Sequence, residues 1–85
     1  MSARGIYNRL LELRESKDLV KIHWAGMHEC IGFVNLLSVD TVTLRHIDSM
    51  GEEDGNLTVP TAQITHIEEE TKEITQIKQY LLQKR

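Results

Sequence analysis

Apolar residues near the start of the chain recur with the period of an α-helix. Ile6, Leu10 and Leu13 stand at i, i+4 and i+7, which places them on one face of a helix. The pattern ends at the polar residues 16–18 without a strong stop signal. The spacing therefore predicts a helix over residues 3–15 with a single apolar stripe.

After this helix the period changes to that of a strand. Val20, Ile22 and Trp24 alternate with polar residues, which predicts a half-buried strand followed by a tight turn. Residues 30–37 are then almost continuously apolar. Such a run predicts a strand that is buried on both faces, or one bent enough to serve two surfaces. Gly32 within the run indicates a bend, a bulge or a close backbone approach.

Three further strands are predicted in the second half of the chain. Residues 41–47 alternate most clearly, and the acidic, glycine-containing segment 48–56 is predicted to be a polar connection. That segment lacks the ligand spacing of a calcium loop, so it predicts no calcium site. A short strand is expected at 57–59, ended by Pro60, which cannot donate to a ladder. The last strand is expected at 63–67.

The end of the chain returns to helical spacing. Ile74, Ile77 and Leu81 stand at i, i+3 and i+7, which predicts an added C-terminal helix over residues 71–84. Acidic residues gather at its start and basic residues, including Lys84, at its end, an arrangement that complements the helix dipole. Its apolar stripe needs a partner, either the sheet of the same chain or a neighbouring subunit.

The length and the cysteine content bound the class of protein. Eighty-five residues suffice for a single domain, 1–85, and are too few for two cores. No apolar run approaches the ~20 residues of a membrane span, so no membrane partner is expected. One cysteine, Cys30, cannot form a disulfide within the chain, which favours a reducing, cytoplasmic location. A core this small is marginal alone, so self-association is expected.

Charge is distributed unevenly along the chain. Residues 1–28 hold five basic against three acidic residues, 29–73 hold two against ten, and 74–85 hold three basic residues, for a net charge of −3. Nucleic-acid binders usually present a basic surface, because counterion release supplies much of their affinity. Only a local basic face built from the two ends of the chain is compatible with that function.

A helix followed by five short strands predicts a mainly β fold. Strands of this length over residues 19–68 close most economically as a small, strongly bent barrel. The chain resembles the Sm and Sm-like (LSm) family, including its bacterial Hfq branch, in residues 29–34, in Asp40 and Leu44, and in residues 58–67. The resemblance implies that the fourth strand of one subunit pairs with the fifth of the next, giving a ring of five to eight copies.

The resemblance also implies an RNA site in two loops. The aspartate of the family's first loop aligns with Ser38 and its asparagine with Thr41, while the arginine–glycine pair of the second loop is replaced by residues 61–63. Hydrogen bonds to base edges and sugar hydroxyls stay available there, but neither loop supplies a positive charge or an aromatic ring. The implied RNA-binding residues are Ser38, Asp40, Thr41, Thr61 and Gln63, with Arg4, Arg9 and Arg14 of the first helix contacting phosphates.

Metal and catalytic chemistry have little support in the sequence. His23, His28 and Cys30 are close along the chain, and His66 could approach them, but zinc needs three or four converging ligands. Residues of these types on neighbouring strands are more often surface and core, so no metal site and no cofactor are predicted. A buried structural role is expected for Cys30, and no oxyanion hole or third catalytic partner accompanies it. The chain is not expected to be an enzyme.

Three functional hypotheses remain. The first is a ring-forming Sm-like protein that binds single-stranded RNA, U- or A-rich, through its loops. The alternative is an Sm-like oligomeric scaffold that has lost RNA binding, which the acidic middle of the chain favours. A monomeric SH3-like module that binds peptides would show the same strand pattern.

Overall fold

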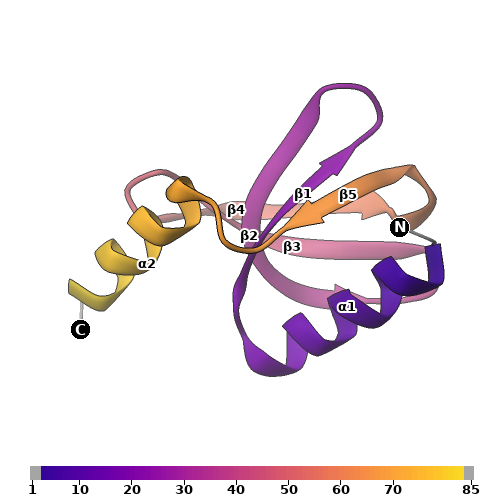
Figure 1. Cartoon of the computed structure of the whole chain (residues 1–85), viewed down its shortest axis with the longest axis horizontal. Coiled ribbons are helices and arrows are strands. Elements are labelled where there is room, and N and C mark those ends of the chain that lie inside the picture. The colour runs from indigo at the N-terminus through magenta and orange to yellow at the C-terminus, as the bar shows by residue number, and fades with distance from the viewer. Residues whose placement is uncertain (1–2, 84–85) are drawn as a thin grey trace.

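The chain folds as five antiparallel strands in one sheet with two helices, so the mainly β class is confirmed. The computed structural model describes residues 3–83. The strands follow the order β4-β3-β2-β1-β5 across the sheet. Figure 1 shows α1 running along one side of the bent sheet and α2 extending from its other end. The elements are α1 (Ala3–Ser16), β1 (Leu19–Trp24), β2 (His28–Leu37), β3 (Thr41–Ile47), β4 (Glu53–Pro60), the 3-10 turn η1 (Thr61–Gln63), β5 (Ile64–Glu68) and α2 (Lys72–Gln83).

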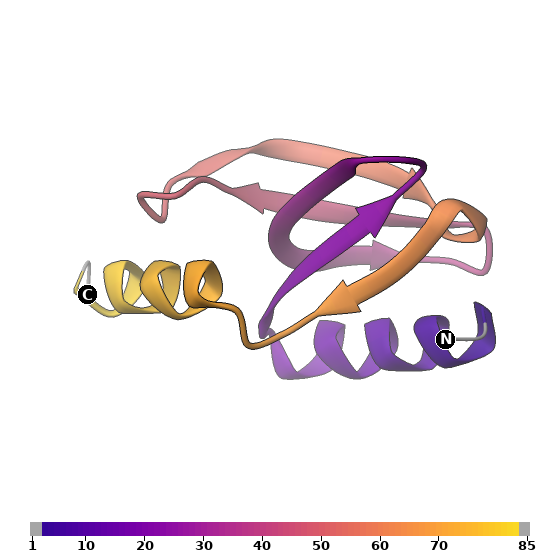
Figure 2. The same ribbon diagram turned by 45° about the horizontal axis from the view of Figure 1, so that its top comes forward.

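The sheet is open, so the closed barrel expected from the strand pattern is not shown. Strands β4 and β5 are its two edges, and within residues 3–83 they do not pair with each other. Helix α1 lies against the bent sheet (Figure 2) and inserts Ile6, Leu10 and Leu13 into the core beneath it. Helix α1 thus covers a core that the strands of a closed barrel would enclose by themselves.

Strand β2 is largely buried on both faces from Cys30 to Val34, whereas Asn35 and Leu36 of the same apolar run are exposed, so the predicted two-sided burial is confirmed only for the first part of the run. Cys30 and Val34 face the core under α1, while Ile31 and Phe33 face a second core under α2. Between these pairs lies Gly32, opposite His46 of β3. A Cβ atom at position 32 would overlap the backbone carbonyl of β3. The close backbone approach expected at this glycine is therefore present.

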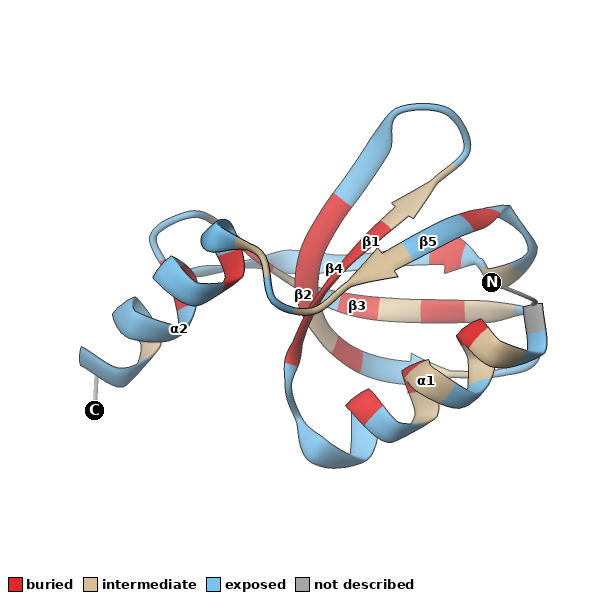
Figure 3. Cartoon of the chain, viewed as in Figure 1, coloured by how far each residue is buried: buried red, intermediate tan, exposed pale blue. Residues whose placement is uncertain are grey.

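Two apolar cores lie on the two sides of β2, so the expectation that 85 residues are too few for two cores is wrong. Figure 3 shows the buried positions along the strands and helices. The C-terminal helix packs on the sheet of its own chain through Ile74 and Ile77. Of the two partners considered for its apolar stripe, the stripe therefore contacts the sheet of the same chain. The core under α1 contains Ile6, Leu10, Leu13, Val20, Ile22, Cys30, Val34, Val42, Leu44, Val59 and Ile64. The core under α2 contains Leu19, Ile31, Ile47, Ile74 and Ile77.

Strand β4 is longer than the sequence predicts. The expected polar connection 48–56 is wrong in its second half, because β4 already begins at Glu53 and pairs with β3. The Nε atom of Arg45 lies 3.0 Å from a carboxylate oxygen of Glu53 across the two strands. Such cross-strand pairs stabilise a strand that is exposed on both faces and so has no apolar alternation. Pro60 ends the strand as predicted.

Both helices agree closely with their predicted ranges. Helix α1 ends one residue later than expected, at Ser16, and is followed by Lys17 in a left-handed conformation with φ 60°. Helix α2 starts after Thr71, whose hydroxyl accepts a hydrogen bond from the backbone N–H of Ile74 at 3.1 Å. Lys84, expected at the end of this helix, lies outside the described residues. Neither described helix combines the length and hydrophobicity that a membrane crossing demands.

The close approach at Gly32 generates a stability prediction. We expect Gly32→Ala to lower the free energy of unfolding by about 1–3 kcal/mol, because β2 and β3 must separate to admit the methyl group. Urea unfolding followed by circular dichroism measures the change. Asn35→Ala on the exposed part of the same strand is the control and should change stability by less than about 0.5 kcal/mol. Equal stabilities of the two variants would contradict the prediction.

Candidate nucleic-acid interface

The two loops that the sequence assigns to RNA lie against each other. The hydroxyl of Thr61 donates a hydrogen bond to the carbonyl of Val39 at 2.7 Å, and its backbone N–H donates to the carbonyl of Asp40 at 2.9 Å. The β2–β3 turn is thereby joined to η1, the short connection between β4 and β5. We call residues 38–41 and 61–63 together the paired loops.

Three hydroxyl groups of the paired loops have structural partners. The backbone N–H of Ser38 donates to the carbonyl of Thr41 at 2.8 Å, and the N–H of Thr41 donates to the Ser38 hydroxyl at 3.0 Å. The two hydroxyls also lie 3.2 Å apart. Together with the Thr61 contacts, these bonds hold the shape of the loops. Ser38, Thr41 and Thr61 therefore maintain the conformation of the loops, because their hydroxyls are engaged in hydrogen bonds within them.

A hollow of about 380 Å³ opens between the paired loops and the start of α1. Arg4 and Tyr7, one helical turn apart, form its helix side. Arg4 belongs to the predicted set, whereas Tyr7 does not. An aromatic ring beside a guanidinium offers the stacking and phosphate contacts that single-stranded nucleic acids use. In the sequence, the position of Tyr7 three residues after Arg4 could have indicated that the two side chains lie together on the helix. The residues around the hollow are Arg4, Tyr7, Val39, Asp40, Thr61 and Ala62.

Gln63, the last residue of the paired loops, is exposed. Its backbone carbonyl accepts a hydrogen bond from the N–H of Ala25 at 3.1 Å, which ties η1 to the β1–β2 turn. A side-chain amide can both donate to and accept from a base edge. Gln63 therefore remains the amide-bearing candidate of the predicted set.

Arg9 is held by carboxylates away from the paired loops. Its Nε donates to Glu69 at 2.6 Å and a terminal nitrogen donates to Glu12 at 2.8 Å. A second hydrogen bond joins its other terminal nitrogen to Glu69. The bond with Glu69 raises the pKa of the Arg9 guanidinium above its ordinary value, and the same bond lowers the pKa of the Glu69 carboxyl. Arg9 would have to leave these partners to contact a phosphate.

Arg14 lies at the other end of α1, ten residues and about 15 Å from Arg4 along the helix axis. It lines a separate hollow of about 430 Å³ with Lys17, Asn35 and Arg45. The Arg45 guanidinium lies over the ring of Phe33, 5.2 Å from its centre. This basic hollow was not predicted, because its cations come from a helix end and from a strand that are distant in sequence.

The four residues considered as zinc ligands do not form one group. His28 stacks on Trp24 with ring centres 5.6 Å apart, in the β1–β2 hairpin. Cys30 is buried, and burial raises the pKa of its thiol to about 11, which suits the expected structural role. His23 and His66, in contrast, are opposite each other on β1 and β5.

Comparison with known proteins adds no assignment to these sites. No protein family matches the sequence, and no curated protein matches it.

The Arg9–Glu69 contact generates a pH prediction. Because the folded-state pKa of Glu69 is lowered from its ordinary value of 4.5, the contact stabilises the fold above that pH and its contribution disappears as the pH falls through the lowered value. Arg9→Met should therefore lower the melting temperature at neutral pH. The difference from the unaltered chain should shrink as the pH falls towards about 3, below the ordinary pKa of a glutamate. Thermal unfolding at several pH values measures this. Arg4→Met is the charge-matched control, and an identical pH profile for both variants would contradict the prediction.

Proposed function

We propose that this chain is the subunit of a closed ring that binds single-stranded RNA at its paired loops. The observation that carries the assembly is the strand order, which leaves β4 and β5 as the two edges of one sheet. The resemblance to the Sm family implies pairing between the fourth strand of one subunit and the fifth of the next. That pairing requires both strands to be edges.

Free edges favour association on physical grounds. An edge strand presents unpaired backbone N–H and C=O groups, which pair readily with another chain. Strand β4 is exposed except at Val59, and Leu57 on it keeps 36% of its surface accessible. Pairing with a second copy would satisfy the backbone and cover this leucine. It would also enlarge a core that is small for a free-standing chain.

The two edges differ from each other, so the contact is head to tail. A head-to-tail interface closes into a ring when the rotation per subunit divides a full turn, and otherwise it produces a filament. Strand β2 is strongly curved (Figure 1), and such curvature favours a compact ring. The family resemblance implies five to eight subunits.

RNA binding is proposed at the paired loops because these loops and the start of α1 supply three useful groups. Arg4 offers a positive charge, Tyr7 a ring for stacking and Gln63 an amide for base edges. A ring repeats this set once per subunit. Weak contacts to successive nucleotides then add up through multivalency, which offsets the low charge of each copy.

A scaffold without RNA is the second candidate, and the charges favour it. The chain carries a net charge of −3, and Arg9 is already engaged by Glu12 and Glu69. In this case the ring would survive while oligonucleotides failed to bind. A monomeric peptide-binding module is distinguished from both by its mass.

The assembly is tested on the full chain by light scattering. We expect a mass of five to eight times the 9.8 kDa of one chain. Leu57→Lys, which puts a charge on the edge strand β4, should shift the mass towards that of one chain. Leu36→Lys on the central strand β2 is the matched control, since Leu36 is 64% exposed and lies away from both edges. A single-chain mass for the unaltered protein would overturn the ring.

RNA binding is tested by fluorescence anisotropy with labelled oligo-U and oligo-A over a range of salt concentrations. Arg4→Gln should weaken binding and reduce the salt dependence, by about 0.7 in slope for each phosphate that the protein no longer neutralises. Lys72→Gln, at the exposed start of α2, is the control for removal of one charge and should behave like the unaltered chain. Absence of binding at low salt by a protein that still assembles would favour the scaffold.

A further inference from the structure

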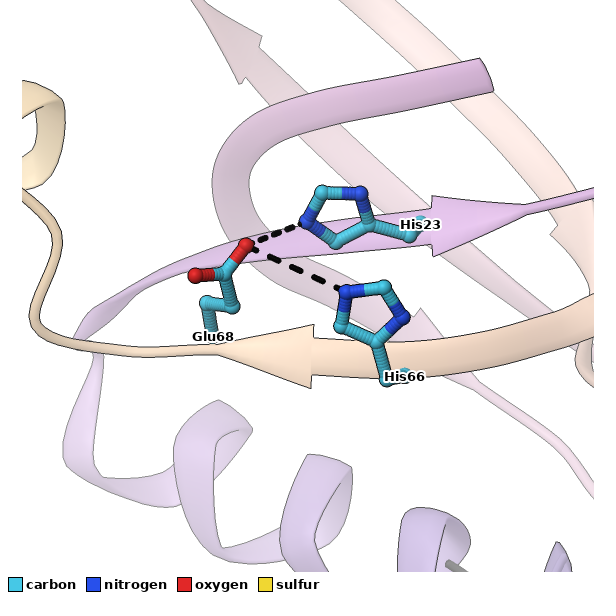
Figure 4. A group of neighbouring side chains, drawn as sticks. All are labelled: His23, His66 and Glu68. Carbon is cyan, nitrogen blue, oxygen red and sulfur yellow. Dashed lines mark hydrogen bonds and ion pairs between the residues drawn. The ribbon is translucent and has the colours of Figure 1, made fainter. Parts of the chain in front are cut away.

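Two histidines and a glutamate converge on the polar face of the β1–β5 pair. His23 of β1 is opposite His66 of β5, and Glu68 follows two residues later on the same strand and hence on the same face. Figure 4 shows both rings directed towards the carboxylate of Glu68. One ligand atom from each of the three residues lies within 4.8 Å of the other two. This convergence is independent of the proposed ring and of the paired loops.

The atoms that face one another are those of a metal-binding set. The Nε2 atom of His23 lies 2.6 Å from Oε1 of Glu68, and Nε2 of His66 lies 4.0 Å from the same oxygen. The two imidazole rings are stacked, with centres 4.0 Å apart and planes 12° from parallel. Two imidazole nitrogens and one carboxylate oxygen are the protein ligands of open zinc sites, in which water takes the fourth position.

The other nitrogen of each ring faces an acceptor. Nδ1 of His23 lies 3.5 Å from a carboxylate oxygen of Glu29. Nδ1 of His66 lies 3.3 Å from the hydroxyl of Thr65, and that hydroxyl gives its proton to the carbonyl of His23 at 3.2 Å. Thr65 is therefore an acceptor towards His66. Nε2 of His23 is hydrogen-bonded to Glu68, so zinc has to displace a proton from this contact. The acceptors near both Nδ1 atoms can hold the N–H once Nε2 binds a metal.

An irregularity in the strand pairing places these groups. The register between β1 and β5 shifts after His23, so that Thr65 is an extra residue on β5 between the positions opposite His23 and Trp24. Such bulges redirect side chains and are common beside functional sites. Here the bulge brings the Thr65 hydroxyl between the backbone of β1 and the ring of His66.

The charge around the site favours a dication. The ammonium of Lys21 lies 2.8 Å from Glu73 of α2 and 3.6 Å from Glu29 of β2. This one ammonium faces the three carboxylates of Glu29, Glu68 and Glu73. These carboxylates exceed the ammonium by two negative charges. A cation placed between the two histidines and Glu68 would balance part of that excess.

We propose that His23, His66 and Glu68 bind one Zn²⁺ ion, with exchangeable water completing its coordination. Ligands of one tetrahedral zinc ion stand about 3.3 Å apart when the bonds are about 2.0 Å. Because the two rings are stacked, the exposed ring of His66 has to turn so that one ion lies in the planes of both rings. Glu68, whose side chain is 43% exposed, has to move away from His23 by less than about 1 Å. His66 is 56% exposed, so solvent reaches the fourth position.

Zinc alone is the probe, titrated into the full chain by calorimetry after treatment with a chelator. We expect one equivalent per chain. His66→Gln should weaken binding by at least about tenfold, because even the loss of an outer hydrogen-bond partner of a ligand costs about 10–100-fold. His28→Gln is the matched control, since His28 is also exposed and lies outside the group, and it should bind zinc like the unaltered chain.

A second measurement keeps the result independent of how the variants fold. In the unaltered protein, zinc should shift the ¹⁵N resonances of Nε2 in His23 and His66 and leave those of His28 and His46 in place. Equal affinities of the His66→Gln and unaltered chains, shifts centred on His28 or His46, or no binding at micromolar zinc would each overturn the proposal.

Discussion

The close contact between the backbones of β2 and β3 at Gly32 determines the shape of the molecule. The missing side chain lets the two backbones approach, and the side chains on either side of Gly32 alternate between two apolar cores, so this one strand has two buried faces. Helix α1 covers the core on one face and α2 covers the core on the other. The sheet can therefore stay open at β4 and β5, because its apolar interior is sealed by helices rather than by a closed ladder.

The polar groups are placed by the same framework. Thr61 joins the two loops at one end of the sheet, and the start of α1 completes a hollow beside them. On the outer face of β1 and β5, the bulge at Thr65 aligns two histidines with a carboxylate. These two sites use different elements and different chemistry, so one can be removed without the other.

The sequence predicts the elements well where burial is periodic. Ile6, Leu10 and Leu13 mark α1 because only one face of that helix is buried, and the same reasoning identifies α2. Residues 53–56 were missed because a strand exposed on both faces has no apolar period. The convergence of His23, His66 and Glu68 could not be predicted from the sequence. Glu68 resembled one more acidic residue before a helix, and its place beside β1 depends on the long-range pairing of β1 with β5.

The two-sided burial of β2 also has a consequence for how the fold comes apart. The apolar clusters share a single strand, so neither can melt while that strand keeps its neighbours on the other side. Amide protons under α1 and under α2 should exchange with solvent at a common rate set by global opening. A small chain with separate clusters thus behaves as one cooperative unit, and its thermal transition reports on both helices at once.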